Sequence, residues 1–216
     1  MRGLNACLVI STISLLVACG NQQQFSVAPA AEEFDQNVTY NNKVDLLWVV
    51  DSSQSMSQHQ QNISQQFSSF IDQLNAKKID YHIAITTMDM SPSGARGRFV
   101  GSPGVLTAST PNAREIFRQN ILIGERGSDV ERGLEAVTVA LSPERLAAEN
   151  SGFLRPDAFL AIVFVTNEDD HSGGSVSNYA EALDEIKAAP ASTPRLWMAN
   201  FIGITEPNGT CFTRGD

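Results

Sequence analysis

The sequence predicts an α/β domain built on a doubly wound, mostly parallel sheet with helices on both faces. Two runs, 44–50 and 159–165, are apolar along almost their whole length, as is typical of strands covered on both sides. Segments with helical periodicity separate these strands from one another, and that alternation is typical of α/β folds. A chain of 216 residues with 42% hydrophobic residues is long enough for one such domain and a leader.

The first half of the domain alternates strand and helix. Strand 44–50 is followed by a helix over 57–74, where apolar residues recur at steps of three and four and the other face is rich in Gln and Ser. Strand 80–87 carries two inward isoleucines. A Gly-, Ser- and Pro-rich stretch follows, in which 98–100 and 105–107 predict a short antiparallel excursion at the sheet edge.

The second half continues this alternation. Apolar residues at helical spacing predict two helices before the central strand and one after it, and a second apolar run predicts a further strand. The region between the second helix and the central strand has no clear periodicity, so we expect an irregular connection there. In order, the elements are helix 112–121, helix 129–141, connection 143–157, strand 159–165, helix 177–188, strand 196–204 and a loop to 216.

The N-terminal residues are a leader rather than part of the fold. Arg2 precedes an apolar run at 6–18, which is short for a membrane span and is typical of a signal peptide. The run ends in Leu-Val-Ala-Cys-Gly at 16–20, which resembles a bacterial lipobox. The resemblance implies that Cys19 is acylated and anchors the chain in the cell envelope, at the outer membrane because Gly20 rather than Asp follows. A plain secretory leader with a chance cysteine is the alternative.

We therefore expect three parts: a signal peptide at 1–18, a polar tether at 19–43 and a folded domain at 44–216. Cys7 leaves with the leader, so Cys211 is either a free buried thiol or paired with a cysteine beyond this chain. We favour the second, because a doubly wound sheet of this kind needs a further helix and, in most cases, a further strand. Either the fold is trimmed or the chain is a fragment whose C-terminal part is missing.

The net charge of −9 excludes one class of partner. Binding to nucleic acid requires clustered Lys and Arg that neutralise phosphates, so nucleic acid is not expected. Two histidines of the predicted domain do not indicate zinc. His82 falls inside a strand, where packing is its expected role, and His171 is expected to face solvent.

The first candidate site is the turn after strand 44–50. Asp51, Ser53 and Ser55 lie at alternate positions there, at the carboxyl end of a predicted strand, where ligands bind in open α/β sheets. Carboxylate and hydroxyl oxygens suit a hard divalent cation such as Mg²⁺. Asp and Ser are also common helix caps, so a turn without a metal is the alternative.

Two later loops are expected at the same edge. Ser128 is placed at the start of helix 129–141, where an N-cap is its alternative role. Strand 159–165 leads into Thr166 and then Asn167, Glu168 and Asp169. Adjacent acidic residues are costly to hold together without a cation or full solvation, and a solvated acidic turn is the alternative here.

Together these loops resemble the metal-ion-dependent adhesion site (MIDAS) of von Willebrand factor type A (VWA) domains, a Rossmann-like fold. Asp-x-Ser-x-Ser follows an apolar strand, and Ser128 stands five and six residues before Gly133 and Leu134, as the hydroxyl residue of the second VWA loop does. The resemblance implies Mg²⁺, with Mn²⁺ or Ca²⁺ as alternatives, at Asp51, Ser53, Ser55 and Ser128. Asn167 departs from the family pattern, which has Asp there, so Glu168 or Asp169 would supply the charge.

The function implied by this resemblance is binding rather than catalysis. The metal would hold an Asp or Glu carboxylate of a protein ligand, in adhesion or another protein interaction at the cell envelope. One rival is a structural envelope lipoprotein whose VWA domain has lost its metal, which Asn167 favours. A Mg²⁺-dependent phosphohydrolase with Asp51 as nucleophile is less favoured, because Ser53 stands where that chemistry needs a second Asp.

Overall fold

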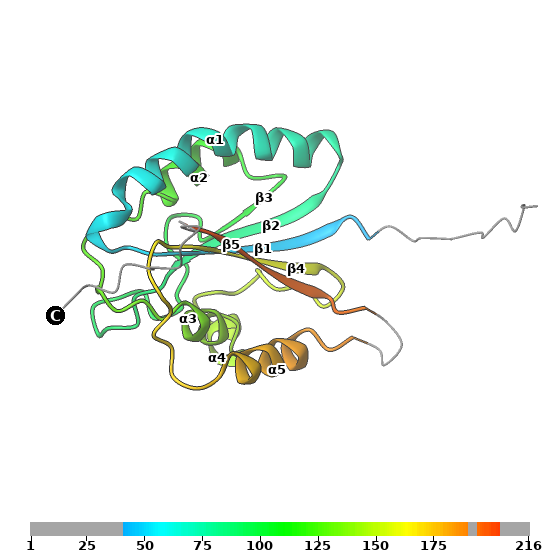
Figure 1. Cartoon of the computed structure of the whole chain (residues 1–216). Helices are drawn as coiled ribbons and strands as arrows, with labels where there is room; N and C mark the ends of the chain where they lie inside the picture. Colours follow the sequence, from blue (N-terminus) through cyan, green and yellow to red (C-terminus); the bar gives the residue numbers. More distant parts are fainter. Residues whose placement is uncertain (1–40, 190–193, 204–216) are drawn as a thin grey trace, which may run out of the picture. The chain divides into compact units, whose positions relative to one another are not determined.

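The structure, a computed structural model, describes residues 41–189 and 194–203. Its centre is a five-stranded sheet in the order β3-β2-β1-β4-β5 (Figure 1), in which only the β2–β3 pairing is antiparallel. This confirms the expected α/β class with a mostly parallel sheet. The strands are β1 (Lys43–Val50), β2 (Asp80–Thr87), β3 (Val105–Thr107), β4 (Phe159–Val165) and β5 (Trp197–Ile202).

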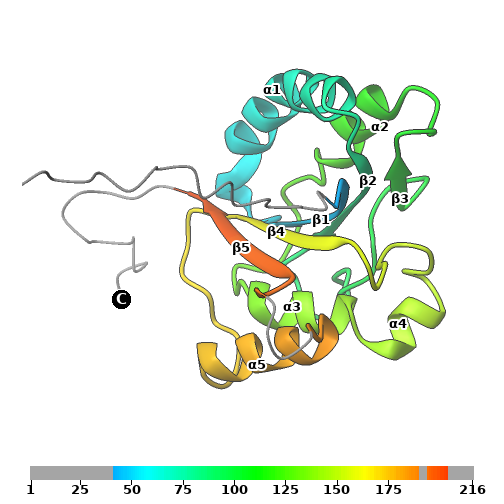
Figure 2. The same cartoon turned by 90° about the vertical axis from the view of Figure 1, so that its right-hand side faces the viewer.

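Helices cover both faces of the sheet. Figures 1 and 2 show α1 and α2 over one face and α3, α4 and α5 over the other. A 3₁₀ turn, η1, leads into α1 directly from the predicted site turn. The helical elements are η1 (Gln54–Met56), α1 (Ser57–Ala76), α2 (Ala113–Asn120), α3 (Gly133–Ala140), α4 (Pro143–Ala147) and α5 (Val176–Ile186).

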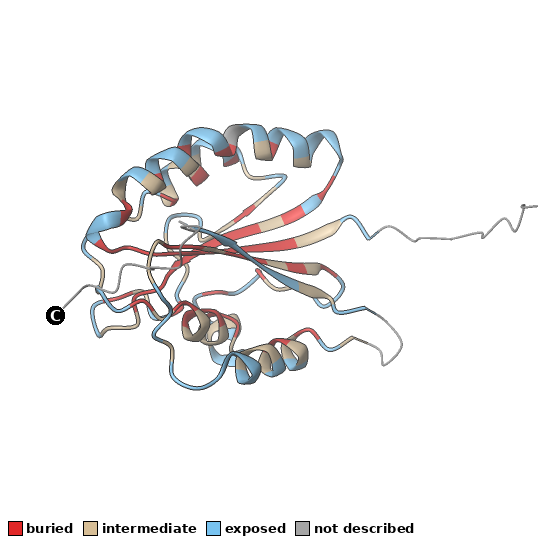
Figure 3. Cartoon of the chain, viewed as in Figure 1, coloured by how far each residue is buried: buried red, intermediate tan, exposed pale blue. Residues whose placement is uncertain are grey.

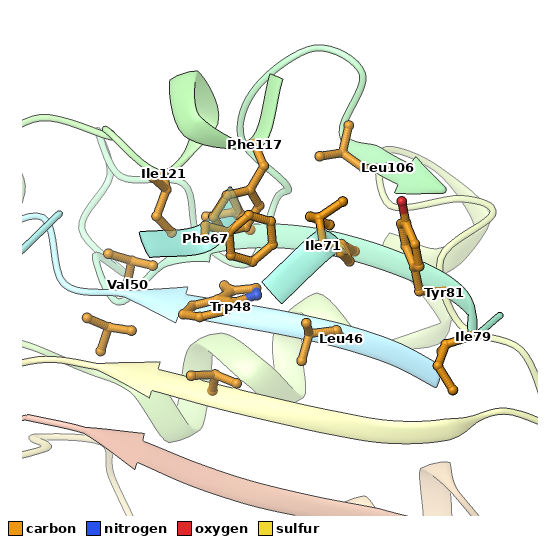
Figure 4. Close-up of a cluster of buried hydrophobic side chains, with 14 of the residues drawn as sticks. Leu46, Trp48, Val50, Phe67, Ile71, Ile79, Tyr81, Leu106, Phe117 and Ile121 are labelled. Atoms are coloured by element: carbon orange, nitrogen blue, oxygen red, sulfur yellow. The ribbon is translucent and has the colours of Figure 1, made fainter. Parts of the chain in front are cut away.

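The face under α1 and α2 holds an aromatic core. Successive side chains of a strand point to opposite faces of its sheet. On this face Trp48 of β1 makes edge-to-face contacts with Phe67 of α1 and Phe117 of α2 (Figure 4). All three are buried. Burying a side chain of this size stabilises the fold by about 1.5–3 kcal/mol, so this cluster fixes the central strand against both helices.

The opposite face is packed more closely by smaller residues. Leu47 and Val49 of β1 are fully buried against α3, whose inward positions are Ala136, Val137 and Ala140. Figure 3 shows the burial concentrated on the central strands, with β5 exposed along its length. Beside β5 an apolar groove runs between α1 and the β4–β5 face, lined by residues such as Phe70, Val163 and Phe201.

The amino edge of the sheet is held by a buried ion pair. Asp45 is fully buried, and its carboxylate accepts hydrogen bonds from the backbone N and Nε of Arg155 at 2.6 and 2.8 Å. The same guanidinium reaches Asp80 at 2.7 Å. Lys187, also buried, donates from Nζ to the carbonyl oxygens of Arg155 and Pro156. Every buried charge in this network therefore has a partner.

Burial also shifts the pKa values in this network. It raises the pKa of Asp45, against the lowering effect of Arg155. It lowers the pKa of Lys187, against the charges of Asp45 and Asp157.

Apart from shifts of one or two residues at the ends of elements, three expectations differ from the structure. Helix α3 begins at Gly133 rather than 129, and the expected irregular connection contains α4. Helix α4 forms because the Ser142 side chain accepts from the Arg145 amide and a proline follows at the first helical position. Residues 98–100 are not a strand, although Val100 donates its amide to Ile85; only 105–107 pairs with β2.

The predicted leader, most of the predicted tether, Cys19 and Cys211 lie outside the described residues. Strand β1 begins at Lys43, one residue inside the predicted tether. None of the helices within 41–189 and 194–203 has the length and apolar character needed to cross a membrane.

Candidate metal centre at the carboxyl edge of the sheet

The pairing of three neighbouring strands sets the position of the candidate site. Val50, the last residue of β1, is in register with Thr87 of β2 on one side and Val165 of β4 on the other. The chains that leave these strands therefore emerge side by side. Asp51 follows the central strand directly and Thr166 follows its neighbour, so the loops predicted to share an edge do so.

Asp51 is held rigidly at the centre of this edge. Its side chain is fully buried. One carboxylate oxygen accepts from the Ser53 amide at 2.7 Å, and the other accepts from Thr166 Oγ1 at 2.8 Å. These two hydrogen bonds, one to each oxygen, fix the orientation of the Asp51 carboxylate.

A row of hydrogen-bonded side-chain oxygens begins at Ser53, the residue whose amide holds Asp51. Ser53 Oγ lies 3.1 Å from Ser55 Oγ, and Ser55 Oγ donates to Asn167 Oδ1 at 3.1 Å. Ser53 is buried, Asn167 is half-buried and Ser55 is exposed. The structure thus brings together four of the predicted site residues from two separate loops, with the outer end open to solvent.

The loop before α3 is fastened to the same turn. Gly127 donates its amide to Ser52 O at 2.9 Å. The side chain of Gln60 from α1 donates to Asp51 O and to Gly124 O and accepts from the Gly124 amide. A Cβ on residue 127 would lie 1.9 Å from Ser52 Oγ, so the close approach of the two loops requires glycine there.

Ser128 differs from its expected position at a helix start. The N-cap of α3 is Arg132, four residues further on, and the Ser128 hydroxyl accepts from the Val130 amide at 3.0 Å. Its loop is joined to the Asp51 turn through Gly127. Within the described residues, however, its hydroxyl forms no hydrogen bond with the side chains of Asp51, Ser53 or Ser55. Its role as a metal ligand stays a prediction.

The acidic turn after β4 has a structural role that the sequence did not reveal. Asp170 accepts from the Leu134 amide at 3.1 Å and from the Ser172 amide at 2.9 Å, so it caps the start of α3 from 36 residues away. Asp169 and His171 are exposed, as expected for His171. Part of the acidic run therefore serves helix α3 rather than a cation.

Glu168 lies closer to the site than Asp169. It is half-buried, and its backbone amide donates to Thr166 Oγ1 at 3.0 Å. Because the same hydroxyl donates to Asp51, Glu168 is tied to the centre of the site through Thr166.

Sequence analysis missed Glu131, which is the most unusual group at this edge. The residue is fully buried, and its side-chain oxygens accept no hydrogen bond. Burial, then the charge of Asp51 and a side-chain hydrogen bond with it, raise the pKa of Glu131 to about 9; the charges of Glu168 and Asp89 act in the same direction. Glu131 therefore lies against Asp51 at the carboxyl edge of the sheet.

The burial of Glu131 could not be read from the periodicity used for the helix. A helix over 129–141 with Val130 and Leu134 inward leaves position 131 on the solvent side. In the structure Val130 is 50% exposed, because α3 begins only at Gly133. Asp89 was missed for a different reason: it follows β2 in a loop rich in Gly, Ser and Pro, where a single Asp is common.

The residues at this edge fit a hard cation. Carboxylate, hydroxyl and amide oxygens are the donors that Mg²⁺, Mn²⁺ and Ca²⁺ prefer. Within residues 41–189 and 194–203, no Lys, Arg or His forms an ion pair with Asp51, Asp89 or Glu131. Nor do three His, Cys, Asp or Glu side chains of this part of the chain form a metal cluster by themselves, so a site here must also use Ser and Asn oxygens.

Comparison with known proteins gives a distant structural likeness. No family model matches the sequence, and no curated protein matches it. Among solved structures the chain is similar to proximal thread matrix protein 1 from the mussel byssus: one crystal form gives 15% identity and a TM-score of 0.42. Another, solved with zinc in its MIDAS motif, gives 18% identity and a TM-score of 0.43. Each match covers 76% of this chain and 38% of the mussel chain, so this chain spans well under half of that protein's length.

Proposed function

We propose that this domain binds a divalent cation at the carboxyl edge of its sheet and uses it to hold a carboxylate of a protein partner. The observation that carries the proposal is the chain of hydrogen bonds that joins Asp51 to the Ser53 amide and the Ser53 hydroxyl, through Ser55, to Asn167. Side chains from two loops converge there without a basic residue of the described chain to neutralise Asp51.

Asp51, Ser53 and Ser55 would hold the cation, with the amide oxygen of Asn167 beside them. Mg²⁺ is the first candidate, and Mn²⁺ or Ca²⁺ are alternatives. A bound cation of this kind supplies a point charge that attracts an incoming carboxylate. Ser55 is the exposed member of this chain of hydrogen bonds, so a partner would approach from that side. Ser128 and Asp169 stay outer candidates, for ligation through water.

We place this site in a VWA-type domain with a MIDAS-like arrangement, whose role is adhesion or another protein–protein interaction. The strand order supports this proposal, with the three loops at one edge of a parallel sheet. We further propose that the chain is a bacterial envelope lipoprotein, anchored through Cys19 at the outer membrane. That part depends on the sequence of the leader alone.

We also propose that the domain is not an enzyme. An aspartyl nucleophile of a phosphohydrolase works with a second Asp two positions on as its acid/base, and Ser53 stands there. In the structure Ser53 is buried and its hydroxyl is bonded to Ser55, so it does not take that role. This argues against the phosphohydrolase alternative.

Isothermal titration of the purified chain with MgCl₂, and separately with MnCl₂ and CaCl₂, tests the cation site. We expect saturable binding of at least one ion, and a loss of affinity on the order of tenfold or more in Ser55→Ala. Ser69→Ala is the matched control, because this exposed serine of α1 contacts only its own helix, at Gln66 O, and should bind as the wild type does.

A chain that binds none of the three ions would overturn the proposal in favour of a metal-free structural domain. One observation supports that rival: the hydroxyls of Ser53 and Ser55 and the amide of Asn167 already hydrogen-bond to one another. If an ion binds, pull-down from an envelope extract with and without EDTA then identifies partners held through the metal.

A further inference from the structure

The fold alone does not explain why the acidic side chain of Glu131 is buried. It is fully buried, and neither side-chain oxygen receives a hydrogen bond. Burying a polar group without a partner destabilises a protein, and burying an isolated charge does so much more. A leucine at this position would fill the space without that cost, so the carboxylate needs a different explanation.

The groups around Glu131 increase the cost rather than relieving it. The charge that raises its pKa most is that of Asp51, and those of Glu168 and Asp89 act in the same direction. Arg132, the next residue along the chain, is directed to Glu135, with which it forms an ion pair. The basic residue nearest in sequence is therefore already used, and the neighbours of Glu131 are acidic.

The backbone prevents Glu131 from turning away. Its carbonyl oxygen accepts from the His171 amide at 2.6 Å, and the next amide, that of Arg132, donates to Met88 O at 3.1 Å. These bonds fasten the residue between the loop after β4 and the loop after β2. The side chain is thus fixed at the meeting point of three strand ends by backbone contacts that do not depend on its charge.

We infer that Glu131 supplies the second negative charge of the cation site, the charge that Asn167 does not provide. The inference rests on the proposed function. The Glu131 carboxyl group lies against Asp51 and accepts no hydrogen bond, so its oxygens are available to a cation or to its bound water, and a bound cation would stabilise the charged form. The second carboxylate of the site would then come from the loop before α3 instead of the loop after β4.

This assignment also makes sense of Asn167. With Glu131 and Asp51 already at the site, a third carboxylate at position 167 would add repulsion between like charges that lie close together. An amide keeps an oxygen there, and that oxygen accepts from Ser55. Glu131 would thus supply the charge that is absent at Asn167, the position where the sequence departs from the VWA pattern.

Titration of four chains with MgCl₂ or MnCl₂ tests the inference: wild type, Glu131→Gln, Asn167→Asp and the double variant. We expect Glu131→Gln to weaken binding on the order of tenfold or more, and the double variant to recover most of that loss, because the Asn167→Asp change restores the charge. Glu149→Gln is the matched control. It removes the same charge from an exposed side chain after α4 that pairs with Arg145, and should leave the affinity within about twofold.

The outcomes separate the two proposals. Absence of binding in the wild type overturns the cation site itself. Binding that is equal in wild type and Glu131→Gln leaves the cation site standing and overturns the role of Glu131, as does equal weakening by Glu149→Gln. Thermal unfolding in EDTA checks that each variant is folded; if Glu131→Gln is not, Glu131→Leu replaces it in the same titration, with the same outcomes.

Discussion

Two buried aspartates, one at each end of the central strand β1, have contrasting surroundings. At the amino end, Asp45 is paired with Arg155 through two hydrogen bonds to one residue. At the carboxyl end, Asp51 is surrounded by hydroxyls, backbone amides and other carboxylates. Both aspartates are fully buried in one strand and its continuation. At the amino end a basic residue of the chain neutralises the aspartate, whereas in the part of the chain that the structure describes no basic side chain pairs with Asp51.

Matched Asp→Asn substitutions test this contrast, and we expect the largest effect at the amino end. Asp45→Asn leaves Arg155 without its buried partner, which should lower the free energy of unfolding by about 3–5 kcal/mol. Asp89→Asn at the carboxyl end keeps an oxygen for the Ser91 amide and removes a charge that acts on Glu131. It should cause no loss. Urea unfolding in EDTA measures both, and equal losses would contradict the comparison.

A smaller, pH-dependent effect is expected from Lys187 at the amino end. Burial lowers its pKa in the folded chain below the ordinary value of 10.5. Between the lowered pKa and 10.5 the unfolded chain binds more protons than the folded chain. Within that window this group therefore makes the free energy of unfolding rise as the pH rises.

The difference in free energy of unfolding between wild type and Lys187→Met should therefore shift in favour of the wild type as the pH rises from about 8 to 10. Lys77→Met removes an exposed lysine at the end of α1 and should show no such trend. Urea unfolding at several pH values gives the measurement. A flat difference for Lys187→Met would mean that its ammonium is not desolvated in the folded chain.

The smallest effect is expected from the outer member of the amino-end network. The Asp80 side chain is 49% exposed, although it lies 2.7 Å from Arg155, and exposed ion pairs contribute little because water and salt screen them. Asp80→Asn should lower the free energy of unfolding by less than about 1 kcal/mol, and by less still in high salt. A loss as large as that of Asp45→Asn would show that burial is not what distinguishes the two aspartates.

The sheet was predictable because its signals are local. Strands β1 and β4 were found from apolar runs that need no partner to be recognised, and the spacing of Asp51, Ser53 and Ser55 on one turn fixed their convergence. The start of α3 was not predictable, because Asp170 and Ser172 determine it from a distant loop. The burial of Glu131 depends on where α3 starts, so it could not be predicted from the local sequence either.

The glycine at 127 has a consequence for how the two loops can respond to a ligand. No side chain fits between residue 127 and Ser52, and Gln60 clamps both segments from α1. The turn after β1 and the segment leading toward α3 thus form one mechanical unit. A ligand that displaces Ser53 or Ser55 would therefore displace residues 124–127 as well, even without contacting them.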